Sequence, residues 1–114
     1  MARILLVDDE PTLLALLRRY LERSQHEVAL CETAEDALRT FQESGPFDLI
    51  VADLTLPAMN GEELIVKLRE LSPGLPAILS SGYSHETHLA GVRFLQKPFL
   101  PNALGDLVTE LLKT

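Results

Sequence analysis

Acidic, hydroxyl and amine side chains follow the apolar segments of this sequence, in a combination that suits chemistry on phosphate. An acid pair follows the first segment, a single acid the third, a serine the fourth and a lysine the fifth: Asp8 and Asp9, Asp53, Ser81, and Lys97. Three carboxylates brought together repel one another, and a hard divalent cation relieves that repulsion. Because no cysteine or histidine is near these positions, oxygen ligands with retained waters favour Mg²⁺ over Zn²⁺.

Together these groups could support the transfer of a phosphoryl group to a carboxylate. A metal ion with open water positions can hold phosphate oxygens, and Lys97 can hold a further oxygen as a point charge. One carboxylate can then attack phosphorus and become an acyl phosphate, a reaction catalysed mainly by positioning and charge neutralisation. Any one of the aspartates taken alone is more often a turn former or a helix cap. The joint pattern over four strand ends favours the functional interpretation.

The apolar segments that must position these groups have the length and composition of buried strands. The sequence predicts five strands, at residues 3–7, 27–31, 47–52, 76–80 and 92–95. Helical spacing of apolar residues predicts a first helix that begins at Pro11 and a second over 34–44 with Thr33 as its cap. A third helix is expected from Glu62 to the break at Pro73, and a last one over 101–113. Strands and helices therefore alternate along the chain.

Alternating strands that are apolar on both faces predict an α/β fold with a doubly wound parallel sheet. Parallel neighbours need crossover helices, and these helices cover both sides of the sheet. In such sheets the functional crevice lies beyond the carboxyl ends of the strands. If the strands at 3–7 and 47–52 are neighbours, the three aspartates meet at that crevice and Lys97 approaches from the other side.

Length and composition set the class of protein. The chain has 114 residues, 46% of them hydrophobic, which predicts one globular domain spanning residues 1–114. The net charge of −7 argues against direct nucleic-acid binding, because phosphate contacts need clusters of Lys and Arg. No apolar run is long enough to span a membrane and no leader is apparent, so we expect neither a membrane segment nor a signal peptide. A single cysteine, Cys31, cannot form an internal disulfide, which fits a reducing cytoplasm.

The order and spacing of five motifs resemble the receiver domain of two-component response regulators over essentially the whole chain. The motifs are Val7-Asp8-Asp9-Glu10-Pro11, residues 48–54, residues 56–61, Ser81-Gly82-Tyr83 and residues 94–99. The resemblance implies a five-stranded, flavodoxin-like sheet of strand order 2-1-3-4-5. It also implies phosphorylation-dependent signalling, with a histidine kinase or a histidine phosphotransfer domain as the phosphoryl donor. Such a domain is a switch and not a metabolic enzyme, since it catalyses only its own phosphorylation and dephosphorylation.

The resemblance implies a role for each acidic residue. Asp53 corresponds to the phosphoacceptor of the family. The implied ligands of Mg²⁺ are the carboxylates of Asp8, Asp9 and Asp53 and the backbone carbonyl of Thr55. Asp9 is the more direct ligand in this comparison, and Asp8 acts partly through water.

The resemblance assigns signal propagation to the last two strands. Lys97 contacts a phosphoryl oxygen, and the bond from Lys97 to Pro98 is expected to be cis. Ser81 corresponds to the switch hydroxyl, and Phe94 to the aromatic residue that turns inward when Ser81 moves. Tyr83, two residues after Ser81, is expected to slow the attack of water on the acyl phosphate.

One segment departs from the family pattern. The connection from Ser81 to Lys97 is shorter than usual, and the missing length falls between Tyr83 and Gly91. The sequence therefore predicts a shortened, irregular or mobile fourth helix. A short fourth helix together with the ending at residues 94–99 resembles the receivers of hybrid sensor histidine kinases. A stand-alone regulator is the alternative, and a homodimer is left open.

Three other functions fit the sequence less well. An aspartyl-phosphate hydrolase of the haloacid-dehalogenase type usually has a second acid two residues after the nucleophile, where this chain has Thr55. A dinucleotide-binding module requires a glycine-rich loop after the first strand, where Asp8 and Asp9 stand instead. A constitutive binding domain without a switch would not need all the site residues of the family. In this sequence all of those positions are filled, which disfavours such a domain.

The remaining reactive side chains are expected to be structural. His26, His85 and His88 are not spaced as a ligand set with Cys31. We expect the histidines at the surface and the cysteine in packing. Leu14 lies beside the expected apolar stripe of the first helix, where it either docks a partner helix or widens the buried stripe.

Overall fold

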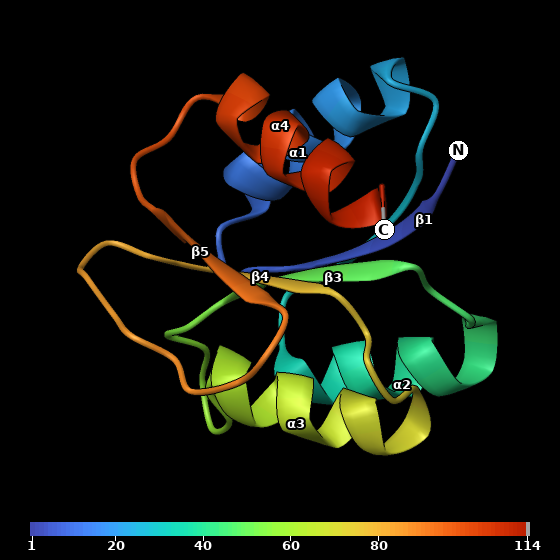
Figure 1. The fold of residues 1–114 in the computed structure, drawn as a ribbon, viewed down its shortest axis with the longest axis vertical. Coiled ribbons are helices and arrows are strands. Elements are labelled where there is room, and N and C mark those ends of the chain that lie inside the picture. The colour runs from blue at the N-terminus through green and yellow to red at the C-terminus, as the bar shows by residue number, and fades with distance from the viewer. Residues whose placement is uncertain (114) are drawn as a thin grey trace.

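A computed structural model describes residues 1–113 of the chain, and this part contains five strands and four helices (Figure 1). The strands are β1 (Arg3–Val7), β2 (Glu27–Cys31), β3 (Leu49–Asp53), β4 (Ala77–Ser81) and β5 (Val92–Gln96). The helices are α1 (Pro11–Arg23), α2 (Ala34–Ser44), α3 (Gly61–Leu71) and α4 (Pro101–Leu112). No helix in this range is both long enough and apolar enough to cross a membrane.

The five strands form one sheet of order β2-β1-β3-β4-β5, and all four neighbouring pairs are parallel. This is the doubly wound, flavodoxin-like arrangement that the sequence predicted. Figure 1 shows α1 and α4 on one face of the sheet and α2 and α3 on the other. The chain reverses its winding direction between β2 and β3, because β1 lies between them. A crevice at the carboxyl ends of β1 and β3 follows from this reversal.

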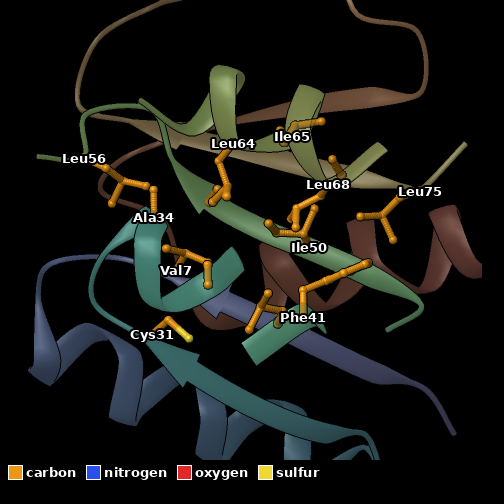
Figure 2. Packing of buried hydrophobic residues seen from close by; sticks show 14 of the residues in the cluster. Val7, Cys31, Ala34, Phe41, Ile50, Leu56, Leu64, Ile65, Leu68 and Leu75 are labelled. Carbon is orange, nitrogen blue, oxygen red and sulfur yellow. The ribbon is translucent and has the colours of Figure 1, made fainter. Parts of the chain in front are cut away.

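The core consists of two apolar layers, one on each face of the sheet. Successive residues of β1 supply both layers: Leu5 packs with residues of α2 and α3, whereas Leu6 packs with residues of α1 and α4. Figure 2 shows the first layer, in which Phe41 of α2 and Leu68 of α3 meet Ile50 of β3. Each fully buried side chain of this size stabilises the fold by about 1.5–3 kcal/mol. The layers therefore hold the strand ends, and the residues that follow them, in fixed positions.

Helix starts follow the local chemistry of the sequence. Pro11 occupies the first turn of α1, where its missing N–H is not needed. The side chain of Thr33 accepts a hydrogen bond from the Asp36 amide, as the sequence predicted. Asn60 and Glu63 form a reciprocal capping box, so α3 begins one residue before the predicted Glu62.

Strand boundaries differ slightly from the prediction. Strand β3 begins at Leu49 rather than at Phe47 and β4 at Ala77 rather than at Pro76, and β3, β4 and β5 each end one residue later than expected. As a result, Asp53 and Ser81 are the last residues of their strands instead of the first residues beyond them. Both side chains are buried, and each residue has one paired neighbour in the sheet, Ser80 for Asp53 and Gln96 for Ser81.

Leu14 belongs to the core. Its side chain is only 3% exposed and packs with Leu17 and Leu21 in the layer between α1 and the sheet. The structure therefore contradicts the interpretation of Leu14 as a docking residue and supports the wider buried stripe. Leu13, one position earlier, is the partly exposed residue, and Leu16 is half exposed.

The connection between β4 and β5, residues 82–91, contains no helix (Figure 1). The helix that the sequence predicted to be short in this connection is therefore absent, and α4 is the helix that follows β5. Contacts with α3 and with the core attach this loop to the body of the domain. The His85 Nε2 atom lies 3.2 Å from the Glu62 carboxylate of α3, and Leu89 packs against the core layer beneath α3. Loop residues thus cover part of the surface that a full helix would cover.

Candidate functional site

Four carboxylates gather where β1 and β3 end. Val7 of β1 pairs with Ala52 of β3, so the residues that follow these two positions face the same crevice. Carboxylate oxygens of four residues, one from each, lie within 4.8 Å of one another: Asp8, Asp9, Glu10 and Asp53. Asp8 and Asp53 are buried, whereas Asp9 and Glu10 are exposed. The three predicted aspartates therefore converge, and the crevice is open on one side.

Lys97 reaches this cluster from the loop after β5. Its Nζ atom donates to Asp8 Oδ2 at 2.8 Å and to Glu10 Oε1 at 2.9 Å, and it lies 3.4 Å from Asp53 Oδ2. The Lys97 amide also donates to the carbonyl of Ser81, which holds the loop against the end of β4. The peptide bond from Lys97 to Pro98 is cis, as expected.

The charges in the crevice alter the proton affinity of two groups. Burial raises the pKa of the Asp8 carboxyl above its ordinary value, against the opposing effect of the hydrogen bond from Lys97. For Lys97, burial acts to lower the pKa, but the hydrogen bonds to Asp8 and Glu10 outweigh it and the pKa is raised. The lysine is therefore a fixed positive charge at neutral pH.

Asp53 is held by partners on both carboxylate oxygens. Oδ1 accepts a hydrogen bond of 3.1 Å from the Thr55 amide, and Oδ2 faces Lys97. Gly61 begins α3 directly against the end of β3, where a Cβ atom would collide with the Asp53 carbonyl oxygen. The glycine thus allows the loop from β3 to α3 to close tightly around the aspartate.

Two residues near Asp53 form a bridge at the open side of the crevice. The Thr55 Oγ1 and Tyr83 hydroxyl oxygens lie 3.2 Å apart. Tyr83 is 60% exposed, so its ring projects into solvent. Its amide donates to the Ser81 hydroxyl oxygen at 3.3 Å, which links this bridge to the end of β4.

Ser81 and Phe94 lie on the neighbouring strands β4 and β5. Ser81 is buried and pairs with Gln96, and its carbonyl accepts from Lys97. Phe94 is partly buried and packs against the core layer beneath α3. The two predicted switch residues are therefore connected to the crevice through β4 and β5.

Glu10 is the residue that the sequence interpretation missed. It was recognised as part of the first motif, but no role was assigned to it. Its position directly after the acid pair was the available signal, since a loop that leaves a parallel strand passes across the crevice. The direction of its side chain toward Lys97 depends on the tertiary structure.

The donor atoms fit a hard divalent cation. The cluster consists of carboxylate oxygens, with no sulfur or imidazole nitrogen among its four members. Two of its carboxylates are buried, and a single ammonium leaves most of the negative charge uncompensated. Oxygen ligands on an open, water-accessible site are the preference of Mg²⁺.

Comparison with known proteins supports the same conclusion. The family model described as "Response regulator receiver domain" matches residues 4–109. This chain belongs to the response regulator receiver domain family. Receiver domains take a phosphoryl group on an aspartate with Mg²⁺, and the function of this domain is phosphorylation-dependent signalling in two-component systems.

Known relatives of this receiver domain include complete regulators. The alkaline phosphatase synthesis transcriptional regulatory protein PhoP of Bacillus subtilis is 32% identical over 117 residues, which cover 97% of this chain and 48% of PhoP. The chain thus spans about half the length of the curated relatives it matches.

Solved structures of receiver domains and response regulators have the same fold, with sequence identities close to that of PhoP. The receiver domain of the hybrid histidine kinase CckA is 30% identical, with a TM-score of 0.85 over 97% of this chain and 99% of that one. The response regulator TrrA of Thermotoga maritima, solved in complex with Mg²⁺ and BeF, is 32% identical, with a TM-score of 0.85 over 97% and 99% of the two chains.

Proposed function

We propose that Asp53 is the phosphoacceptor of this receiver domain. One observation carries this assignment: the Lys97 ammonium contacts the carboxylates of both Asp8 and Asp53, so one crevice contains an acceptor, an acid pair and a phosphate-binding cation. Among the acids of the cluster, Asp53 is the one on β3. It also has a backbone amide on its second oxygen, which orients the carboxylate.

Phosphoryl transfer then follows from the positions of these groups. A carboxylate oxygen of Asp53 attacks phosphorus on a phosphohistidine, the new O–P bond forms, and the N–P bond breaks with the imidazole as leaving group. Lys97 turns from the carboxylates of Asp8 and Asp53 toward a phosphoryl oxygen and stabilises the charge that develops on it. Hydrolysis of the acyl phosphate by water resets the domain, so its catalysis is directed only at itself.

The proposed metal ligands are Asp8, Asp9, Asp53 and the backbone carbonyl of Thr55. When bound, Mg²⁺ supplies charge neutralisation and orients the phosphoryl oxygens. The support for this set is the convergence of the three carboxylates at one crevice. The backbone of Thr55 is adjacent, since its amide bonds to Asp53.

The proposed switch uses Ser81 and Phe94. A phosphoryl group on Asp53 offers new acceptor oxygens, and the Ser81 hydroxyl is a donor at the end of the neighbouring strand. Movement of Ser81 toward the phosphoryl group would leave space into which Phe94 turns. The phosphorylated domain therefore favours a different surface at β4 and β5.

The phosphodonor is proposed to dock beside Lys97. A groove of about 450 Å³ there is lined by Glu10, Leu13, Gly82, Lys97, Pro98 and Phe99. Leu100, next along the chain, is 72% exposed. An apolar groove next to the acceptor suits the helices of a histidine kinase or a histidine phosphotransfer domain.

The parent protein is proposed to be a hybrid histidine kinase that takes part in a phosphorelay. The absence of a helix between β4 and β5 supports this origin over a stand-alone regulator, and the CckA receiver is one of the similar solved structures. We further propose that residues 1–114 form one receiver domain, of which Thr114 lies outside the described residues. The net charge of −7 supports the proposal that the domain does not itself bind nucleic acid, and size-exclusion chromatography tests whether it forms a homodimer.

Incubation with phosphoramidate or acetyl phosphate, followed by intact-mass measurement, tests the proposed function. The wild-type domain should gain one phosphoryl group, about 80 Da, when Mg²⁺ is present and not when it is chelated. The Asp53→Ala variant should gain none. Steady turnover of small phosphate esters without labelling would instead indicate a hydrolase, and labelling of Asp53→Ala would reject this acceptor.

A further inference from the structure

Glu10 has a contact that the proposed function does not use. Its side chain is 59% exposed, yet its carboxylate lies 2.9 Å from the Lys97 Nζ atom. Asp8 and Asp53 lie 2.8 Å and 3.4 Å from the same atom. An ammonium group has three N–H donors, so three carboxylates account for all of them.

Two of these three contacts conflict with the binding of Mg²⁺. Asp8 and Asp53 are proposed metal ligands, and the lysine contacts one Oδ2 atom of each. Two cations thus compete for the same carboxylates. Lys97 is only 16% exposed, and withdrawal from both partners without a substitute would leave a poorly solvated charge.

Glu10 offers that substitute. It belongs to the cluster but stands on its solvent side, and it is absent from the proposed ligand set. A lysine that releases Asp8 and Asp53 can remain bonded to Glu10 and stay next to the crevice, where a phosphoryl oxygen will need it.

We propose that Glu10 is a positioning residue that retains Lys97 at the site while Mg²⁺ takes over the carboxylates of Asp8 and Asp53. This inference rests on the proposed function and adds a role to a residue outside its catalytic set. It acts through Lys97 and not through a bond from Glu10 to the metal.

Calorimetric titration of the domain with Mg²⁺ tests this role. Glu10→Gln keeps the shape of the side chain and removes its charge. We expect it to weaken Mg²⁺ binding by about 2- to 5-fold, the range typical of an exposed ion pair. Glu32→Gln, which removes an exposed acid after β2 that is outside the cluster, is the matched control and should leave the affinity unchanged.

A double-variant cycle separates positioning from direct ligation. In a Lys97→Met background the Glu10→Gln change should have no effect on Mg²⁺ affinity, because the ammonium through which Glu10 acts is gone. An equal or larger loss in that background would show that Glu10 is itself a ligand and would overturn the proposal. An equal loss in Glu32→Gln would overturn it in favour of a general charge effect.

A second measurement covers the case in which Lys97→Met does not fold. In the metal-free wild type, the NMR signals of the Lys97 ε-methylene group should shift in Glu10→Gln and not in Glu32→Gln. No shift would overturn the proposal. If the wild type binds Mg²⁺ but Glu10→Gln binds it equally well, this inference alone fails, whereas a wild type without Mg²⁺ affinity contradicts the proposed function itself.

Discussion

At the scale of single residues, the ammonium group of Lys97 contacts three carboxylates that lie far from it in the sequence. Lys97 is 89 residues from Asp8 and 44 from Asp53 in sequence, yet it contacts both. The raised pKa of Asp8 indicates that burial of this carboxylate is costly without a further cation. The site is therefore arranged to receive further positive charge, which suits the proposed Mg²⁺ ion.

Tyr83 should control the lifetime of the phosphorylated state. Its hydroxyl contacts that of Thr55, whose amide bonds to Asp53, so we expect the tyrosine to restrict the approach of water to the acyl phosphate. We expect Tyr83→Glu to lose its phosphoryl group several-fold faster than the wild type. The measurement is the decay of the phosphorylated mass after removal of the donor.

The Tyr83→Phe variant separates ring size from the hydroxyl contact. If the ring blocks water, this variant should decay at nearly the wild-type rate, and if the bridge to Thr55 is required it should decay as fast as Tyr83→Glu. Equal half-lives in the wild type and Tyr83→Glu would remove the proposed role of Tyr83.

Site residues could be predicted from the sequence where the end of a strand determines their position. They could not be predicted where the contact depends on the direction of a side chain. Asp8, Asp53 and Lys97 could be grouped because parallel strands bring their carboxyl ends to one edge. The contact from Glu10 to Lys97 could not be predicted, since an exposed side chain after a strand can point in several directions. Leu14 was ambiguous for a related reason: the width of a buried stripe depends on how α4 packs against α1.

At the scale of secondary structure, helix caps determine where the loops of the crevice begin and end. Thr33 caps α2 immediately after β2, and Asn60 caps α3 after the loop from Asp53. The Thr33 cap was predicted from the sequence, whereas Asn60 was taken only as part of a loop. The complete loss of a helix from residues 82–91 was not predicted either, because a short polar segment can form either one helical turn or a loop, and tertiary contacts decide between them.

Removal of the Thr33 cap should destabilise the domain. Thr33→Ala deletes the acceptor of the Asp36 amide and should lower the free energy of unfolding by about 1 kcal/mol. Urea denaturation followed by circular dichroism measures this, since the chain has no tryptophan. The matched control is Thr109→Ala, the same change at an exposed position inside α4, which should alter stability by less than about 0.5 kcal/mol. Equal effects of the two changes would contradict the capping role.

At the scale of the whole molecule, two apolar layers fix the sheet while its carboxyl-end edge remains polar and open. The alternation of apolar segments predicted a parallel sheet with helices on both faces, whereas the order of the strands was predicted only from the resemblance to receiver domains. The layers explain why the fold tolerates a loop in place of a helix between β4 and β5. Strand β5 lies at the edge of the sheet, and Leu89 and Phe94 still pack against the layer beneath α3.

The stability of the whole domain should fall in mildly acidic solution. His26 accepts a hydrogen bond from the Ala2 amide through Nδ1, and burial lowers the pKa of His26 below its ordinary value of 6.5. Because His26 then binds a proton more tightly in the unfolded chain than in the folded one, its contribution to the free energy of unfolding is fully present above about pH 6.5. That contribution declines as the pH falls toward the pKa of His26 in the folded state. The lowered pKa of Glu62, due first to its hydrogen bonds with Thr87 and His85, adds a separate decline below about pH 4.5.

Urea denaturation at pH 7.5 and at pH 5.5, values that lie about one unit on either side of the ordinary histidine pKa, isolates the first effect. His26→Gln should show a smaller loss of unfolding free energy between the two conditions than the wild type does. His88→Gln, a change at an exposed histidine of the loop after β4, should behave as the wild type. A wild-type loss that persists unchanged in His26→Gln would show that another group is responsible.

Chemical localisation of the phosphoryl group tests the central claim most directly. Borohydride reduces an aspartyl phosphate to an alcohol and leaves free carboxylates intact. The domain is phosphorylated in the presence of Mg²⁺, treated with borohydride and digested, and mass spectrometry of the peptides then identifies the acceptor residue. We predict reduction at Asp53 alone. Reduction at Asp8 or Asp9, or a phosphoryl group on a histidine with Asp53 unmodified, would contradict it.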